Sequence, residues 1–167
     1  MSDQEAIGRL VLTALDALGE PYEVIECDPE LADTAQFCEH YDIPVAHSGN
    51  TIIVASKRDP VRFSACLVTA TTRLDVNKTV KRLMDAGKLS FASAVQTVAL
   101  TGMLVGGVTP FALPEQLPLY VDRRVMELDY VVLGGGSRSQ KISVAPAVLE
   151  RLRGMQIVEG LGLEPRP

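Results

Sequence analysis

The chain has few of the residues that usually build a covalent or metal-dependent active site. It contains no Trp, two His and three Cys in 167 residues. Cys27, Cys38 and Cys66 are widely spaced, odd in number and without a CxxC pair, which predicts buried free thiols and neither a disulfide framework nor a zinc site. A Ser/His/Asp or Cys/His site would need His40 or His47, which we expect at a helix end and in a loop. The sequence therefore predicts no metal and no cofactor.

Positive charge and long apolar segments are also scarce. The 16 Lys and Arg against 21 Asp and Glu give a net charge of -5. This balance argues against a long nucleic-acid duplex such as duplex DNA as the partner, while contact with one end of a nucleic acid stays open. No apolar run approaches the roughly 20 residues that span a bilayer, and the first ten residues lack the features of a signal peptide. We therefore expect no membrane partner and a cytoplasmic location.

What the chain does have is enough apolar residues, 47% of the total, for one sizeable core. The fold class that we predict is α/β, or α+β, with a mixed central sheet flanked by helices in a single domain. Segment 62–71 is apolar on both faces and should be the central strand. The domain should cover residues 1–154, followed by a frayed tail over 155–167. Caps and periodicity predict helices at 3–18, 34–40, 75–86, 94–101 and 146–153, and strands at 22–25, 51–55, 62–71, 119–121, 130–133 and 141–144.

Two glycine-containing segments are the most informative part of the sequence. They are TGMLVGGVTPFAL, which starts at Thr101, and the turn from Gly134 to Ser137. Glycines let main chain approach a ligand closely, and a proline fixes a loop, so these segments predict a pocket lined by backbone. Peptide N–H groups between Gly106 and Pro110 could stabilise the oxyanion of an ester-hydrolysis intermediate. The alternative is that Gly106 and Gly107 only form a tight turn. The triple glycine lacks the GK[ST] ending and the following helix of a phosphate-binding loop.

These segments, with LDYVVLGGGSRSQKISVAPAVLERL and the order of elements, resemble the YbaK family of prolyl-tRNA synthetase-associated editing domains. The family pattern is met by Thr34-Ala35, Asn50-Thr51-Ile52, Leu74-Asp75 and the loop from Gly106 to Pro110. The resemblance implies a YbaK-like sheet and a pocket for an aminoacyl group esterified to the 3′ end of tRNA. It also implies hydrolysis of that ester, with alanine or cysteine on tRNA(Pro) as the mischarged substrate and prolyl-tRNA synthetase as a further partner. In the family, a bound water and the vicinal ribose hydroxyl serve the reaction.

The resemblance also assigns site residues. The catalytic set is Asn50, Gly106, Gly107, Val108, Thr109 and Pro110, and the substrate-binding set is Thr34, His47, Ser48, Gly134, Gly135, Gly136 and Ser137. Members that deacylate carry a lysine where this chain has Asn50, so the alternative is a binding module that holds an aminoacyl-like ligand or a protein. We do not expect Lys57 to substitute, because seven residues of strand span about 23 Å at ~3.3 Å per residue. Candidates for phosphate contacts are Arg123, Arg124, Arg138 and Lys141.

Overall fold

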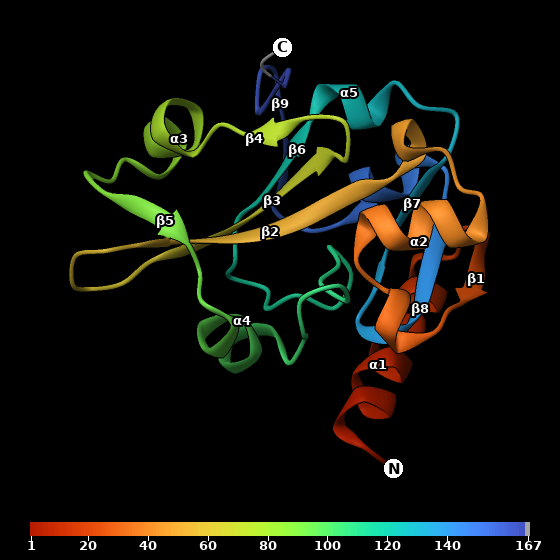
Figure 1. Cartoon of the computed structure of the whole chain (residues 1–167). Coiled ribbons are helices and arrows are strands. Elements are labelled where there is room, and N and C mark those ends of the chain that lie inside the picture. Colours follow the sequence, from red (N-terminus) through yellow and green to blue (C-terminus); the bar gives the residue numbers. More distant parts are fainter. Residues whose placement is uncertain (166–167) are drawn as a thin grey trace.

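A mixed five-stranded sheet runs through the computed structural model, which describes residues 1–165 (Figure 1). Its strands, in spatial order, are β5 (Leu89–Phe91), β2 (Gly49–Ser56), β3 (Phe63–Thr69), β6 (Leu119–Asp122) and β9 (Met155–Val158). β2 is antiparallel to both of its neighbours, whereas β3, β6 and β9 are parallel. The mixed α/β class and the central position of β3 are confirmed, and Cys66 on β3 is fully buried.

A second, antiparallel sheet lies beside the start of β2. It has the order β1 (Tyr22–Glu26), β8 (Ser137–Val144) and β7 (Val131–Gly135). A parallel bridge between Ser48 and Val132 joins the beginning of β2 to β7. The short strands β4 (Arg73–Leu74) and β10 (Gly162–Leu163) form a separate antiparallel pair. The junction between the two larger sheets is therefore where β2 begins.

The helices follow the predicted caps in most cases. They are α1 (Asp3–Leu18), α2 (Thr34–Tyr41), α3 (Lys81–Met84), α4 (Ala94–Thr101) and α5 (Arg123–Met126), with 3-10 turns at Pro29–Leu31, Val45–His47 and Pro146–Arg151 and a π turn at Val76–Val80. Ser2 and Ser93 both form complete capping boxes, and Gly19 and Gly102 end these two helices with positive φ. Within residues 1–165, no helix combines the length and apolarity needed to cross a membrane.

The C-terminal segment differs from the expectation of a frayed tail. Residues 155–158 form β9 at the edge of the central sheet, and Val158 and Leu161 are buried. The apolar side chains of this segment find partners on β6 and β4, and local sequence cannot reveal that pairing. Arg166 and Pro167 lie outside the described residues. Two helix predictions also need correction: 146–153 is a 3-10 turn, and 75–86 starts as a π turn and ends at Asp85.

Candidate active site

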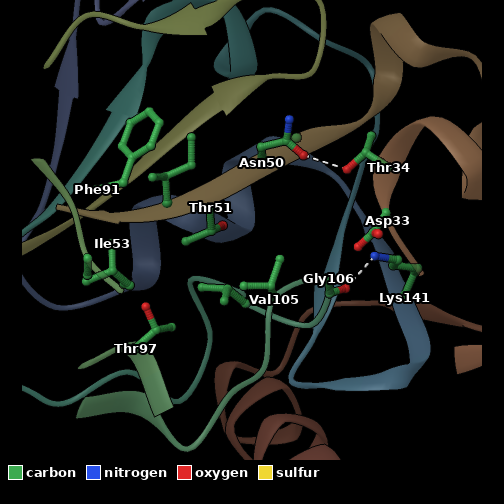
Figure 2. A pocket seen from close by; sticks show the side chains of 15 residues that line it. Asp33, Thr34, Asn50, Thr51, Ile53, Phe91, Thr97, Val105, Gly106 and Lys141 are labelled. Carbon is green, nitrogen blue, oxygen red and sulfur yellow. Dashed lines mark hydrogen bonds between the residues drawn. The ribbon is translucent and has the colours of Figure 1, made fainter. Parts of the chain in front are cut away.

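A cavity of about 430 Å³ opens beside β2, between β5 and the loop that precedes Pro110. Figure 2 shows its two chemical ends. Ile53 and Phe91 stand at one end with Thr97, whereas Thr34 and Asn50 stand at the other. The full lining is Asp33, Thr34, Gly49, Asn50, Thr51, Ile52, Ile53, Phe91, Ala92, Thr97, Val105, Gly106, Val108, Gly134 and Lys141. The cavity thus has an apolar end and a polar end.

Two cationic side chains from β8 hold the first peptides of the glycine loop. Arg138 Nη1 donates to the carbonyl of Val105. Lys141 Nζ donates to the carbonyl of Gly106 at 2.6 Å, as Figure 2 shows. In a trans peptide, the C=O and the N–H of one unit point in opposite directions. The bond from Arg138 therefore also sets the direction of the Gly106 N–H.

The next peptide of the loop is fixed by the triple-glycine turn. Gly136 N–H donates to the carbonyl of Gly107 at 2.7 Å, and Gly107 N–H donates to the carbonyl of Leu104 at 2.8 Å. A Cβ at Gly107 would fall 2.6 Å from the carbonyl oxygen of Gly136, and a Cβ at Gly134 would overlap the carbonyl of Val108. The two glycine segments thus pack backbone against backbone, and their glycines are required by that close approach.

This arrangement decides which loop N–H groups remain for a ligand. The Gly107 N–H is consumed by the turn, so the expectation that it serves as an oxyanion donor is not met. Within residues 1–165, the N–H groups of Gly106 and Val108 have no acceptor, and both residues line the cavity. Thr109 and Pro110 are buried away from it. Two N–H groups of the predicted loop therefore remain for a ligand.

Asn50, the residue that the family resemblance places at the lysine position, is tied to α2. Its Oδ1 accepts a hydrogen bond of 2.6 Å from the hydroxyl of Thr34, the first residue of that helix. The bond fixes the amide and leaves its NH₂ group as a neutral donor. Thr34 and Asn50 are thus brought together in the lining of the cavity.

Lys141 is the cation of this site, and its position is different from the predicted one. The side chain is 6% exposed, and Nζ lies 2.6 Å from the carbonyls of both Ala32 and Gly106 and 5.4 Å from the Phe37 ring centroid. Burial lowers the pKa of Lys141 below its ordinary value, and the nearby Asp33 acts in the opposite direction. Lys141 is therefore not the solvated charge of an exposed strand, and its role as a phosphate contact stays a prediction.

The other predicted phosphate ligands are also engaged within the protein. Arg138 makes an ion pair of 3.1 Å with Asp33. Ion pairs to Glu159 and Glu164 engage Arg123 and Arg124 at 2.9 and 3.2 Å.

Several predicted substrate-binding residues lie outside the cavity. The ring of His47 stacks on that of Tyr130 with centroids 4.1 Å apart, and its Nδ1 lies 2.9 Å from the Tyr130 carbonyl. The hydroxyl of Ser48 is buried 3.2 Å from Cys38 Sγ. Gly135, Gly136 and Ser137 are buried in the β7–β8 turn, and only Gly134 of this group reaches the lining. Among the described residues, no cluster of three His, Cys, Asp or Glu side chains could hold a metal ion.

Some lining residues were not singled out from the sequence. Phe91 and Ile53 carry no local signal of a site, because an apolar residue on a strand is ordinarily core. Lys141 was singled out only as a candidate for a phosphate contact, because the carbonyls of Ala32 and Gly106 that hold it belong to segments distant in the sequence.

Comparison with known proteins identifies the class. Residues 28–152 match the model of the aminoacyl-tRNA editing domain, and the chain belongs to this family. The resemblance seen in the sequence is thereby confirmed. Over 108 residues the chain is 24% identical to EbsC of Enterococcus faecalis, a proposed Cys-tRNA(Pro)/Cys-tRNA(Cys) deacylase, and the match covers 65% of this chain and 63% of EbsC.

Two solved structures share the fold. One is a proposed trans-editing enzyme for prolyl-tRNA synthetase, with a TM-score of 0.77, 24% identity and coverage of 91% of this chain and 94% of that one. The other is the hypothetical protein APE2540, with a TM-score of 0.81, 25% identity and coverage of 92% and 99%. Both likenesses extend over most of the chain.

Proposed function

We propose that this protein is an aminoacyl-tRNA deacylase that removes a small mischarged amino acid, alanine or cysteine, from tRNA(Pro). The observation that carries the proposal is the fixed loop, in which the N–H groups of Gly106 and Val108 are left without a partner in the described chain. Membership of the editing family supports hydrolysis, and the name of EbsC supports cysteine on tRNA(Pro). The name of the first solved neighbour supports an association with prolyl-tRNA synthetase.

The reaction needs little from the protein beyond positioning and charge stabilisation. Water adds to the ester carbonyl carbon, and negative charge collects on the carbonyl oxygen. The bond between this carbon and the ribose oxygen then breaks, and the proton from water passes to that oxygen by way of the vicinal hydroxyl, as the family resemblance implies. Each N–H donor that is fixed before the reaction stabilises the oxyanion, and loss of one such donor typically costs ~3 kcal/mol.

The cavity fits a small aminoacyl group. Its volume of about 430 Å³ must hold the side chain, the ester and part of the terminal ribose. The apolar end at Ile53 and Phe91 receives a methyl or thiol group. At the polar end, the oxygens of Thr34, Asn50 and Asp33 are acceptors for the α-ammonium group.

Lys141 supplies the positive charge that Asn50 does not. Two of its three N–H groups are directed to the carbonyls of Ala32 and Gly106, and the third remains for a ligand in the cavity that it lines. Because Lys141 acts on the loop through Gly106, its principal role is that of a positioning residue.

Deacylation of alanyl-, cysteinyl- and prolyl-tRNA(Pro) by the purified protein tests the proposal. We expect faster hydrolysis of the first two esters than in buffer, and Gly106→Val should abolish the gain. Gly106 has φ +91°, and a Cβ there would overlap the guanidinium of Arg138. Gly154→Val is the matched control, because Gly154 has φ +76° and open space around it. Equal activity of the two variants would place the oxyanion site elsewhere.

A binding module is the second candidate, and the neutral Asn50 held by Thr34 is the observation that favours it. Such a module would bind a non-hydrolysable aminoacyl-adenosine amide and leave every aminoacyl ester intact. Binding of the amide together with no hydrolysis of any of the three esters would select this alternative.

A further inference from the structure

The positive charge of the chain is concentrated in one segment. Residues 57–88 contain eight of the 16 Lys and Arg but only three of the 21 acidic residues, which are all Asp. This segment therefore carries +5, and the rest of the chain carries -10, within the total of -5. A net negative protein thus has a strongly basic region.

The fold gathers most of these cations on one surface. Six of them form what we call the basic patch: Lys57, Arg58, Arg62, Lys81, Arg82 and Lys88. All six are exposed, and Figure 1 places the β2–β3 turn, α3 and the start of β5 on the same side of the molecule.

Contacts between these elements confirm that the surface is continuous. Lys57 N–H donates to the carbonyl of Lys88 at 3.0 Å, and Arg62 Nη2 donates to the carbonyl of Asp85 at 3.0 Å. A Cβ at Gly87 would lie 3.7 Å from Arg58 Nη1.

The cations of the basic patch also lack ion-pair partners in the described chain. Within residues 1–165, none of its six cations makes an ion pair, although Asp59 and Asp85 lie on the same surface. By contrast, Arg123, Arg124, Arg138, Arg151 and Arg153 all have carboxylate partners. Surface cations without carboxylate partners repel each other, and binding of a polyanion relieves this repulsion. Binding also releases the counterions of the polyanion.

β5 connects the basic patch to the cavity. Lys88 immediately precedes this strand, and Phe91, its last residue, is 60% exposed and lines the cavity. Three residues of strand span about 10 Å at ~3.3 Å per residue. An exposed aromatic ring at the cavity rim is a surface on which a nucleobase can stack.

We propose that the basic patch binds the phosphates of the tRNA acceptor stem, while the 3′-terminal nucleotide passes Phe91 and delivers its aminoacyl ester to the cavity. This inference rests on the proposed function, because it assumes that the ester end of a tRNA occupies the cavity. It assigns stem recognition to cations that are distinct from Arg138 and from the buried Lys141. The phosphates are recognised by charge, and no base-specific contact is required.

An RNA hairpin with the sequence of the tRNA(Pro) acceptor stem and its unpaired 3′ end is the probe, and fluorescence anisotropy measures its Kd against salt. The test variant is the triple Lys57→Gln, Arg58→Gln, Lys88→Gln. If all three cations contact phosphates, the slope of log Kd against log salt should fall by about 2.7, at about 0.9 per contact. The advantage of wild type over the triple variant should then shrink about 40-fold between about 50 mM and about 200 mM salt.

The matched control removes the same charge elsewhere, as the triple Arg9→Gln, Arg123→Gln, Arg153→Gln. The control should keep the slope and Kd of wild type to within about twofold. If both triple variants lost hairpin affinity and salt slope equally, the cause would be the change in net charge, and the proposal would be overturned. Absence of hairpin binding by wild type, or a wild-type preference for anionic phosphatidylserine vesicles over the hairpin, would also overturn it.

Two further measurements separate this proposal from the proposed function. Alanyl-adenosine ester has no stem, so the test triple should hydrolyse it at the wild-type rate. If wild type hydrolyses neither this ester nor alanyl-tRNA(Pro), the proposed function fails while hairpin binding is still measured directly. A Phe91→Ala variant should weaken binding of the hairpin with its unpaired 3′ end and leave binding of a blunt hairpin unchanged. An equal effect on the two hairpins would show that the 3′-terminal nucleotide does not contact Phe91.

Discussion

Replacing Lys141 by Met tests whether a buried ammonium group holds the catalytic loop in place. The change removes two charge-assisted hydrogen bonds of 2.6 Å, to the carbonyls of Ala32 and Gly106. Such bonds contribute about 1.5 to 3 kcal/mol each, but burial of the charge already offsets part of this. We therefore expect the free energy of unfolding to fall by roughly 2 to 4 kcal/mol. A displaced Gly106 peptide should lower kcat by about 10²- to 10³-fold, as the loss of one oxyanion donor does.

Urea unfolding and the deacylation of alanyl-tRNA(Pro) measure the two effects separately. Lys141→Gln retains a neutral donor and should recover part of kcat, whereas Lys78→Met removes an exposed lysine and should change neither quantity. Because burial lowers the pKa of Lys141, the unfolded chain binds this proton more tightly. The free energy of unfolding should consequently increase with pH between the folded-state pKa of Lys141 and its ordinary value of 10.5. The Lys141→Met variant should lack this contribution. A folded Lys141→Met protein with the wild-type kcat would refute the positioning role.

Three other changes probe the cavity and the core. Asn50→Lys should raise kcat/KM for alanyl-tRNA(Pro) by roughly ten- to hundredfold, since a charge-assisted hydrogen bond adds ~1.5 to 3 kcal/mol, and the binding-module alternative expects no gain. Gly134→Ala should cost about 1 to 3 kcal/mol in urea unfolding, because its Cβ would overlap the Val108 carbonyl, and unchanged stability would show that the loop can yield. Burial raises the pKa of Cys66 to about 12, so a thiol reagent should label it only in urea, and rapid labelling of native protein would contradict its interior position.

Much of the fold was predictable because its strongest signals are local. The capping boxes at Ser2 and Ser93 and the doubly apolar segment of β3 fix their elements without help from distant residues. The strands that were missed are β4, β5, β9 and β10, which have two to four residues each. Strands so short have too little periodicity to detect, and they are stabilised by pairing partners far away in the sequence.

The candidate site was predictable where backbone chemistry defines it. Glycines at 107 and 134 are needed because main chain meets main chain, whereas Gly106 is needed because its φ is +91° and the Arg138 guanidinium fills the place of a Cβ. The burial of Lys141 was not predicted, because the alternation in SRSQKISV resembles a half-exposed strand. The carbonyls of Ala32 and Gly106 that cover its ammonium group come from segments distant in the sequence, so the local pattern could not reveal them.

The net charge of -5 does not describe the basic patch, and electrostatic screening determines how far the acids elsewhere oppose a phosphate there. At physiological ionic strength, exposed charges farther apart than about 8 Å interact weakly, so acids on α1 or near the C-terminus barely oppose a phosphate at Lys57 or Lys88. At about 0.01 M salt the screening length grows to about 30 Å, and the excess of acids elsewhere begins to oppose the same phosphate. Long-range repulsion of this kind should flatten the plot of log Kd against log salt at its low-salt end. A protein whose charge is uniformly basic has no such opposing field, so the curvature of this plot reports the separation of charge that the fold creates.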